Sequence, residues 1–514
     1  NTNDWTVNGV AAADQLTDNP SGNNFCTWNP LKVWHNSYPV TLGEGNLYVV
    51  FTDTSGLRNQ HIYGTMAVTS GKWYWEQVCT AVGGEQYIGV AGANASLGTP
   101  SPSRYYRNNG NKYLDSGSAT SYGATWTTGD VMGCELDLDA GTIEFFKNEA
   151  SQGVAYTDLL SALPAGGWTI YAGGYNNGAA TIYTSDAKWT YTPSSGFVAL
   201  NTANLPEPTI GPNSTTLTSE VFDSILYTGN GTAIGSGGKT ISSLAFQPDF
   251  TWIKNRDATD SHMLFDAVRG VTKYLESDTA DAEATDTESL ASFTATGFTL
   301  GNNVAVNTNT EDYVAWNWKA NGAGAANEDG SINTTKTSAN TDAGFSILQY
   351  TGNATDEATV GHGIGAVPKF GIFKMISQNA AAGYDVYVYH ASLGQSLKLK
   401  LNTTGAESAS TDWPVAATTS LFTLGDGGAN NGSGLVYAAY LFAEIEGFSS
   451  FGSWTGIAGG EFIYTGFRPA FVLVKRTNAS GWYIFDDKRG VNGAINWLGP
   501  NVTTAEGSTS GFQI

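Results

Sequence analysis

Alternation of apolar and polar residues dominates the first 200 residues and predicts β-strands, because side chains of a strand point to opposite faces in turn. The clearest example is a hairpin in which Cys134–Leu138 and Thr142–Lys147 flank a turn at Asp139-Ala140-Gly141. Further short strands rich in aromatic and β-branched residues are predicted at Leu47–Phe51, Lys72–Val78 and Tyr87–Ala91. Many short strands at this spacing predict an antiparallel β-sandwich.

The sequence of this part of the chain resembles a known family. The segments that resemble the SPRY (B30.2-like) domain are Ser70–Glu76, Tyr87–Val90, Gly129–Leu138 and Phe145–Asn148. The resemblance covers about residues 23–200 and implies two packed antiparallel sheets of concanavalin-like topology. It also implies a module that binds protein or glycan partners through its end loops and performs no chemistry. Residues Phe25–Tyr38 depart from the vertebrate PRY pattern, so we do not expect that subfamily's peptide pocket.

The rest of the chain is internally repetitive, and a strand with proline, then phenylalanine, then lysine recurs three times. We name these copies 1, 2 and 3. Their signature residues are Pro248, Phe250 and Lys254 in copy 1, Pro368, Phe370 and Lys374 in copy 2, and Pro469, Phe471 and Lys475 in copy 3. The intervals between copies have the length of whole domains and exceed the length of solenoid turns.

Other positions keep the same register. Each copy opens with an aromatic strand that ends in Thr-Gly, at Phe222–Asn230, Phe345–Asn353 and Phe448–Gly456. An aspartate, an arginine and a glycine follow as Asp266, Arg269 and Gly270 in copy 1 and as Asp486, Arg489 and Gly490 in copy 3. Copy 2 keeps Gly394 but has His390 and Leu393 in place of the charged pair. An Ala-Glu pair then aligns at Glu283, Glu407 and Glu506.

A closing strand is present at Tyr313–Trp318 in copy 1 and at Tyr437–Phe442 in copy 2. Copy 3 has no such strand, so we expect its sheet to end in an unpaired edge unless another segment or chain fills it. We also expect the natural chain to continue past Ile514. The signature strand is predicted to be the central strand of each copy and to serve as scaffold.

These patterns predict an all-β, multidomain fold in which a concanavalin-like SPRY β-sandwich precedes three related β-sandwich-type domains. The expected divisions are an approach segment at 1–22, the sandwich at 23–200, a proline-containing linker at 201–218, copy 1 at 219–320, a linker or long surface loop at 321–342, copy 2 at 343–447 and an incomplete copy 3 at 448–514.

Composition narrows the classes of function. Charged residues make up only 14% of the chain, glycine contributes 63 residues and aromatic residues 12%, which is typical of a folded all-β protein. The net charge of −22 repels phosphate backbones and anionic membranes, so nucleic acid is not an expected partner. No apolar run has the length that a membrane-spanning helix needs, and membrane insertion is not expected.

Candidate catalytic and metal groups are few. The lysine, aspartate and arginine of copies 1 and 3 could suggest acid–base or anion-binding work, but copy 2 replaces the acid and the arginine while keeping the frame, which favours structural ion pairs. Glu135, Asp137 and Asp139 alternate along one strand, as a cation site, a glycosidase pair or any solvated strand face would. The cysteines at 26, 79 and 134 and the five histidines have no metal-ligand spacing. We therefore predict no catalytic residue, no metal and no cofactor.

The best sequence candidate for recognition is an Asn- and Gly-rich segment at 101–113. It contains Arg104, Tyr105, Tyr106, Arg107 and Tyr113, and aromatic side chains with arginine are typical of adaptable binding loops. Sugar rings stacking on these tyrosines is one hypothesis. The alternative is that the tyrosines pack at the end of the sandwich.

The combination of a SPRY-like domain, a proline-containing linker and the three copies resembles structural proteins of marine bacteriophages, such as tail fibres and other virion appendages. The resemblance implies a non-enzymatic protein on the virion surface, outside the cell, that contacts other virion proteins and a host receptor or glycan, and it implies a trimer. Capsid decoration or a head fibre is one alternative, and an extracellular carbohydrate-active enzyme is another.

Overall fold

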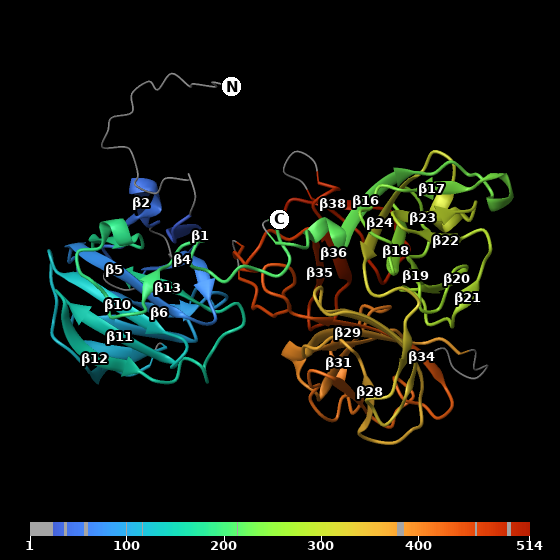
Figure 1. Ribbon diagram of the computed structural model, residues 1–514. Helices are drawn as coiled ribbons and strands as arrows, with labels where there is room; N and C mark the ends of the chain where they lie inside the picture. Colours follow the sequence, from blue (N-terminus) through green and yellow to red (C-terminus); the bar gives the residue numbers. More distant parts are fainter. Residues whose placement is uncertain are drawn as a thin grey trace. The chain divides into compact units, whose positions relative to one another are not determined.

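The computed structural model describes residues 24–34, 39–55, 60–98, 100–115, 117–212, 214–377, 385–457, 460–490 and 495–514 (Figure 1). The predicted approach segment at 1–22 lies outside the described residues. The chain forms two compact units. Unit 1 contains Asn1–Glu207 and Trp454–Gly466, and unit 2 contains Pro208–Ser453 and Phe467–Ile514. The division at Glu207 falls within the stretch predicted as a proline-containing linker.

Unit 1 contains two large sheets that are antiparallel except for the pairing of β15 with β5. One sheet has the order β1-β4-β13-β6-β7-β8-β9, and its strands are β1 (Trp28–Trp34), β4 (Gln60–Val68), β6 (Gln86–Gly92), β7 (Ser103–Arg107), β8 (Asn111–Leu114), β9 (Thr120–Ser121) and β13 (Trp168–Gly174). The other has the order β12-β11-β10-β5-β14-β3-β2, with β15 beside β5. Its strands are β2 (Thr41–Gly43), β3 (Tyr48–Phe51), β5 (Lys72–Ala81), β10 (Val131–Asp137), β11 (Thr142–Lys147), β12 (Ala150–Tyr156), β14 (Gly178–Tyr183) and β15 (Val198–Ala199).

The core of unit 1 lies between these sheets and includes Trp28, Trp75, Cys134, Ile143 and Trp168, all completely buried. Period-two alternation produces this arrangement, because every second residue of β10 and β11 points into the core. The predicted hairpin is confirmed, with Leu136 opposite Ile143.

Copy 1 forms a six-stranded sheet and a three-stranded sheet. The large sheet has the order β16-β24-β18-β19-β20-β21, with strands β16 (Phe222–Thr228), β18 (Phe250–Asn255), β19 (Met263–Asp266), β20 (Lys273–Glu276), β21 (Ala284–Thr285) and β24 (Asp312–Trp318). The small sheet has the order β17-β23-β22, with strands β17 (Lys239–Ile241), β22 (Leu290–Thr294) and β23 (Gly297–Leu300). Helix α1 (Val304–Asn307) begins after Asn303, whose side chain accepts a hydrogen bond from the amide of Ala305.

Copy 2 uses the same central order of strands. Its large sheet runs β25-β26-β27-β34-β29-β30-β31-β32, with strands β25 (Ala325–Asn327), β26 (Thr334–Asn340), β27 (Phe345–Thr351), β29 (Pro368–Met375), β30 (Tyr387–His390), β31 (Leu397–Lys400), β32 (Ser408–Ala409) and β34 (Val436–Ala443). Strands β28 (Ala358–Gly361) and β33 (Leu421–Leu424) form a separate pair. Copy 3 contributes two pairs, β35 (Phe471–Lys475) with β36 (Trp482–Asp486) and β37 (Ile495–Trp497) with β38 (Gly507–Thr509).

Each large sheet of unit 2 packs on both faces. One face of the copy 1 sheet lies on a core that includes Ile253, Phe265 and Phe298, and one face of the copy 2 sheet lies on a core that includes Phe373 and Phe422. The remaining faces meet in a core shared by all three copies, which we call the shared core. Its buried members include Phe250, Trp252 and Trp316 from copy 1, Phe345, Ile372 and Tyr440 from copy 2, and Trp482, Ile484 and Leu498 from copy 3.

The all-β multidomain prediction is confirmed, and two of its details are wrong. Residues 321–342 are not a linker or a surface loop, because β25 and β26 extend the copy 2 sheet and Ser338 pairs with Ile347. Residues 454–466 were expected in copy 3 but belong to unit 1. There the amide of Tyr464 donates to Asn94 at 2.7 Å and Glu461 lies 3.8 Å from Lys32.

Candidate functional site

The signature strands occupy equivalent places in the three copies. In copies 1 and 2, the strands β18 and β29 lie inside their sheets, flanked on one side by the closing strand and on the other by the next strand along the chain. Phe250 pairs with Asp266, Phe370 with His390 and Phe471 with Asp486. The sequence alignment of Asp266, His390 and Asp486 therefore matches the strand register.

The side chains of the signature lysines donate hydrogen bonds to backbone carbonyls. The Nζ atom of Lys254 donates to the carbonyls of Asn255 at 2.6 Å and Ala258 at 3.0 Å, and that of Lys475 donates to Arg476 at 2.7 Å and Asn478 at 3.0 Å. The Nζ atom of Lys374 donates to the carbonyl of Thr279 in copy 1 at 3.2 Å. Burial lowers the pKa of Lys254 and of Lys374 to about 8. These ammonium groups fix turns and bridge copies.

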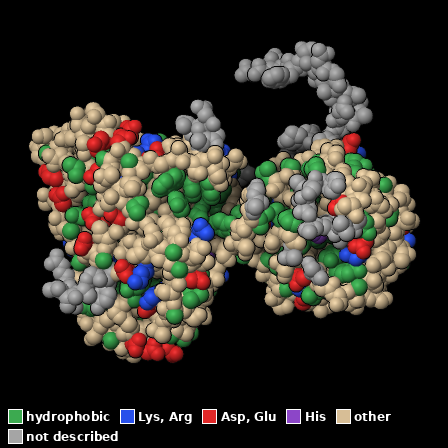
Figure 2. Space-filling view, turned by 180° about the vertical axis from the view of Figure 1, so that it is seen from behind, with side chains coloured by type: hydrophobic (Ala, Val, Ile, Leu, Met, Phe, Trp, Pro, Cys, Tyr) green, Lys and Arg blue, Asp and Glu red, His purple; other side chains and the backbone are tan. Residues whose placement is uncertain are grey.

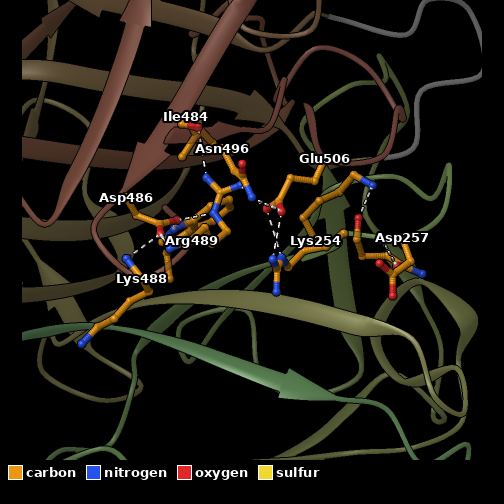
Figure 3. Close-up of polar contacts among 11 residues, drawn as sticks. Lys254, Asp257, Ile484, Asp486, Lys488, Arg489, Asn496 and Glu506 are labelled. Atoms are coloured by element: carbon orange, nitrogen blue, oxygen red, sulfur yellow. Dashed lines mark hydrogen bonds and ion pairs between the residues drawn. The ribbon is translucent and has the colours of Figure 1, made fainter. Parts of the chain in front are cut away.

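A buried cluster of charges joins copy 3 to copy 1 (Figure 3). Asp486 and Arg489 are both fully buried at their side chains, and Arg489 Nε lies 2.6 Å from the carboxylate of Asp486. The same guanidinium donates to Glu506 at 2.9 Å and to the carbonyl of Ile484 at 3.1 Å. In Figure 3 the side chains of Asp486, Arg489, Asn496 and Glu506 point toward one another.

Residues of copy 1 complete this cluster. Trp316 donates from Nε1 to Asp486 at 2.9 Å, and its ring lies 5.5 Å from the guanidinium carbon of Arg489. The guanidinium of Arg256 donates two hydrogen bonds to the carboxylate of Glu506, at 3.0 and 2.8 Å. Such bidentate pairs fix both distance and orientation.

An equivalent cluster joins copy 2 to copy 1. Arg269 Nε lies 2.5 Å from Asp266, its Nη1 lies 3.4 Å from Glu283, and its Nη2 donates to the carbonyl of Leu264 at 2.9 Å. The hydroxyl of Tyr440 donates to Asp266 at 2.7 Å. Tyr440 occupies the position in the closing strand of copy 2 that Trp316 occupies in copy 1. In both clusters, therefore, a buried aspartate accepts a hydrogen bond from the closing strand of another copy.

Backbone hydrogen bonds of the aligned glutamates link the copies head to tail. The amide of Glu283 in copy 1 donates to Ile376 of copy 2 at 3.4 Å, that of Glu407 in copy 2 to Thr477 of copy 3 at 2.7 Å, and that of Glu506 in copy 3 to Arg256 of copy 1 at 2.9 Å. Each acceptor lies two residues after a signature lysine. The three copies thus form a closed cyclic arrangement within one chain.

The buried charges are suited to hold the copies together. Each arginine is paired with two carboxylates, and the positions of Asp266, Asp486, Arg269 and Arg489 are 5% exposed or less. Removing one partner of such a pair strongly destabilises the fold, because the remaining charge is buried and has no counter-charge. Gly270 and Gly394, which follow these positions, have φ angles of +94° and +73°, a left-handed conformation that favours glycine, and Gly490 is exposed. Pro248 and Pro469 precede β18 and β35, and Pro368 is the first residue of β29.

The Glu506 carboxyl should make the free energy of unfolding depend on pH. Burial alone would raise the pKa of this carboxyl, but hydrogen bonding from Arg256 and the charge of Arg489 lower it below its ordinary value of 4.5. A depressed pKa stabilises the folded protein above pH 4.5, and that stabilisation is lost as the pH falls through the lowered value. We expect Glu506→Gln to reduce the free energy of unfolding at pH 7 by about 1–3 kcal/mol.

The difference between wild type and Glu506→Gln should shrink on acidification. Urea denaturation followed by circular dichroism at pH 7, 5 and 3 would measure it. A difference that stays constant down to pH 3 would contradict the assignment of the charge interaction to Glu506.

The residues predicted for recognition at 101–113 lie on strands, so the expectation of a loop is wrong. Tyr105 and Tyr106 belong to β7 and Tyr113 to β8, and all are 9% exposed or less. The rings of Tyr105 and Tyr113 stack at 5.2 Å. Arg104 lies 2.7 Å from Asp158 and Arg107 lies 2.9 Å from Glu85, so carboxylates hold both arginines in place. The geometry favours the alternative that these side chains serve packing.

Two of the three alternating carboxylates, Glu135 and Asp137, differ from a solvated strand face, whereas Asp139 is exposed in the turn after β10. Glu135 is 6% exposed and accepts a hydrogen bond from the amide of Ser194 at 2.6 Å. Asp137 is 9% exposed and lies 2.7 Å from Lys72, and Asp139 accepts from the amide of Gly71. In the part of the chain that the structure describes, no group of three potential ligands is placed to hold a metal ion. The three cysteines are free and buried.

An open hollow of about 420 Å³ lies on unit 1 and is lined by Asp186 and residues 189–197. Its aromatic walls are Trp189, Tyr191 and Phe197, each partly exposed. Two contacts fix the position of Trp189. Its ring packs edge-on against Tyr74 with ring centroids 4.9 Å apart, and its Nε1 donates to the carbonyl of Tyr183 at 3.2 Å. Partly exposed aromatic rings on a fixed frame can stack against a ligand ring.

Buried carboxylates fix the segment that forms the hollow. Glu76 is fully buried and accepts from the amides of Thr190 at 2.7 Å and Tyr191 at 2.8 Å, while Glu135 accepts from Ser194. The sequence contained a signal for this site, because Trp189, Tyr191 and Phe197 stand among threonine, serine, proline and glycine in a short stretch near the predicted linker. Our prediction instead favoured the tyrosines of β7.

Comparison with known proteins matches two separate parts of the chain. The model of a family described as "Domain of unknown function (DUF7483)" matches residues 217–514. The chain belongs to this family. The matched region contains all three copies of unit 2. A second model, the SPRY domain, matches residues 72–165, and the chain therefore contains a SPRY domain in unit 1. This confirms the SPRY resemblance at the level of the domain.

The curated relatives match the SPRY part. Ran-binding protein 9 of Xenopus tropicalis is 30% identical over 167 residues, which cover 30% of this chain and 29% of that protein. Ran-binding protein 10 of Danio rerio is 31% identical over 147 residues, which cover 26% of this chain and 23% of that protein. The chain thus spans less than a third of the length of these relatives.

Solved structures of SPRY domains also match. The SPRY domain of human HERC1 is 20% identical, with 30% of this chain and 96% of that chain covered and a TM-score of 0.24. The PSpry domain of TRIM65 is 15% identical, with 31% of this chain and 92% of that chain covered and a TM-score of 0.23.

Proposed function

We propose that this DUF7483-family chain is a structural, non-enzymatic protein of a bacteriophage virion, a tail fibre or similar appendage, that displays its SPRY domain for binding to the host cell surface. The observation that carries the proposal is the aromatic hollow on unit 1. It offers Trp189, Tyr191 and Phe197 on a segment fixed by Glu76 and Glu135. Fixed aromatic side chains bind with little loss of conformational freedom.

The second support is the architecture of the DUF7483 region. Its three copies share one core and are joined by buried ion pairs and by the backbone bonds of three glutamates. These contacts resist separation of the copies, as a scaffold under mechanical load requires. Among the described residues, no helix has the length and apolar character needed to cross a bilayer.

The surface charge fits a role outside the cell without nucleic acid. The chain carries 46 acidic and only 24 basic residues. Figure 2 shows acidic side chains spread over the visible face among neutral ones, with few lysines and arginines between them. Such a surface repels nucleic acid and favours solubility. The ligand class that suits the hollow is a host glycan, because sugar rings stack on tryptophan and tyrosine, or an exposed loop of a surface protein.

Trp189→Ala should weaken binding to host cells or to their purified surface glycans by at least tenfold, about 1.4 kcal/mol or more, because it removes the largest aromatic wall of the hollow. Fluorescently labelled chain and a host-cell binding assay would measure the change. The matched control is Trp454→Ala, since Trp454 is a 45% exposed tryptophan that does not line the hollow.

Equal loss in both variants would indicate a general surface effect and would contradict the hollow as the binding site. Full binding by Trp189→Ala would contradict it as well. Circular dichroism of both variants would show that the fold is kept. Release of reducing ends from host polysaccharide by the wild-type chain would instead support an enzyme and overturn the proposed function.

A further inference from the structure

The aromatic hollow on unit 1 lies next to buried negative charge. The segment 189–197 that lines it contacts Glu76 of β5 and Glu135 of β10, which are 0% and 6% exposed. Glu76 accepts hydrogen bonds from the amides of Thr190 and Tyr191, and Glu135 accepts one from the amide of Ser194. Both carboxylates are therefore one hydrogen bond away from the backbone that lines the hollow.

These two carboxylates have no cationic partner. In the part of the chain that the structure describes, neither Glu76 nor Glu135 forms an ion pair with a lysine or an arginine. The further partner of Glu76 is the neutral hydroxyl of Tyr74, which donates at 3.0 Å. Asp186 adds a third carboxylate, and it is the single charged residue among those that line the hollow. Because buried charges are screened less by salt than exposed ones, a negative potential extends into the hollow.

The lysines near the hollow leave an excess of negative charge. Lys72 lies 2.7 Å from Asp137, so its own charge is already balanced. Its Nζ atom also lies 5.7 Å from the centre of the Phe197 ring, which shows that a wall of the hollow accommodates an ammonium group. Lys188 is exposed and does not line the hollow.

The lining segment offers hydrogen-bond acceptors in preference to donors. The amides of Thr190, Tyr191 and Ser194 are bound to the two glutamates, and that of Phe197 donates to the carbonyl of Ser194 at 3.3 Å. Pro193 has no amide hydrogen, and an ionised carboxylate such as that of Asp186 can only accept. An ammonium group is a donor without acceptor capacity, so it complements this lining.

The aromatic walls suit the same ligand. Trp189 and Tyr191 are partly exposed, and among the described residues no lysine or arginine lies over either ring. The faces of tryptophan and tyrosine rings attract cations. They also present an apolar surface against which the ring of a sugar can pack.

We propose that the hollow binds an amino sugar of a glycan through its free ammonium group. The inference rests on the proposed use of the hollow as the binding site, and it adds the class of ligand. The ammonium group would lie near Asp186 and the buried glutamates, and the sugar ring would pack on Trp189 or Tyr191. An acidic sugar would bring its carboxylate toward three others and would be repelled.

Isothermal titration calorimetry of the full chain with single sugars tests the proposal, at a pH at which glucosamine is protonated. Glucosamine should bind about tenfold more tightly than N-acetylglucosamine, its matched control without the charge. Glucuronate should not bind. Added sodium chloride should weaken the binding of glucosamine and leave that of N-acetylglucosamine unchanged, because salt screens only the charged ligand.

Variants of the chain locate the binding. Trp189→Ala should weaken glucosamine binding by about tenfold or more, since it removes the largest aromatic face. Asp186→Asn keeps the size of an exposed side chain and should weaken glucosamine binding about threefold, as expected for one surface charge. Trp454→Ala is the control and should leave binding unchanged, because Trp454 does not line the hollow.

Four outcomes would overturn the inference: no binding of glucosamine, equal binding of glucosamine and N-acetylglucosamine, glucosamine binding that survives Trp189→Ala, or binding of choline in place of glucosamine. The proposed function is tested separately by the host-cell assay. Loss of host-cell binding in Trp189→Ala without a preference for glucosamine would overturn the inference alone. Glucosamine binding that is lost in Trp189→Ala while host-cell binding is kept would support the inference and contradict the proposed function.

Discussion

Replacing Asp486 with alanine is expected to destabilise the DUF7483 region by about 3–5 kcal/mol, because the buried guanidinium of Arg489 loses its closest carboxylate. Trp316 loses the acceptor of its Nε1 hydrogen at the same time. The effect exceeds that of a surface ion pair, since water cannot replace the lost partner at a fully buried position. Denaturation with urea, followed by circular dichroism, measures the change.

The chain offers two controls for this prediction. Asp487 is the exposed neighbour of Asp486, and Asp487→Ala should change stability by less than about 0.5 kcal/mol. Copy 2 supplies the second control, because it carries histidine and leucine at these positions. The double variant Asp486→His with Arg489→Leu should cost less than Asp486→Ala alone. A double variant that is less stable than the single one would contradict the account of an unpaired buried charge.

Trp316→Ala is expected to cost about 3–5 kcal/mol, since it opens a large cavity in the shared core. The ring is fully buried and lies 5.7 Å from Phe471 of copy 3 and 6.1 Å from Trp252. It also stands over the guanidinium of Arg489. Trp316 thus contributes packing, a hydrogen bond and a cation–π contact to the joint between copies 1 and 3.

Trp316→Phe separates these contributions. Phenylalanine keeps much of the ring but leaves Asp486 without the indole donor, so the expected cost is about 1–3 kcal/mol. Thermal or urea denaturation of the three proteins would give the order wild type, Phe variant, Ala variant. An alanine variant as stable as wild type would show that the joint between copies 1 and 3 does not support the fold.

Much of the local structure could be predicted from the sequence. The hairpin of β10 and β11 follows from strict alternation around an Asp-Ala-Gly turn, and the signature strands follow from their apolar residues. The alignment of Asp266, His390 and Asp486 placed these residues in the same register as the structure does. Each of these depends on contacts between neighbouring strands, which leave a periodic trace in the sequence.

The errors concern residues whose partners lie far away in the chain. Residues 325–340 are rich in small polar residues because β25 and β26 lie at the edge of their sheet, and such composition resembles a linker. From the sequence, Arg104 and Arg107 are expected at the surface. In the structure they form ion pairs with Asp158 and Glu85. Nothing in the local pattern around 101–113 reveals these carboxylates.

The start of copy 3 shows a different kind of error. The alignment used Trp454-Thr455-Gly456, yet Tyr464-Thr465-Gly466 repeats Tyr227-Thr228-Gly229 and Tyr350-Thr351-Gly352 without change. In copies 1 and 2 that tyrosine stacks on the first tyrosine of the closing strand, Tyr227 on Tyr313 and Tyr350 on Tyr437. Copy 3 has no described closing strand, and Tyr464 instead bonds to Asn94 of unit 1. The motif is therefore present in the sequence, and among the described residues its tyrosine contacts unit 1.

The cyclic arrangement of the copies could not be derived from the alignment. Three aligned glutamates reveal equivalence but not that each donates its amide to the next copy. That information lies in the shared core, where Phe250 stacks on Tyr440 at 4.4 Å and Phe471 meets Trp316. Sequence repetition indicates related units, and only the packing shows how they associate.

Antibodies raised against the purified chain provide the most direct test of the proposed role. Under the proposed function, immunogold labelling and electron microscopy of bacteriophage particles should place the chain on a tail fibre or similar appendage, and the antibodies should block adsorption to host cells. Labelling confined to the capsid shell with unchanged adsorption would contradict a host-binding appendage, and virions free of the chain would contradict a structural role altogether.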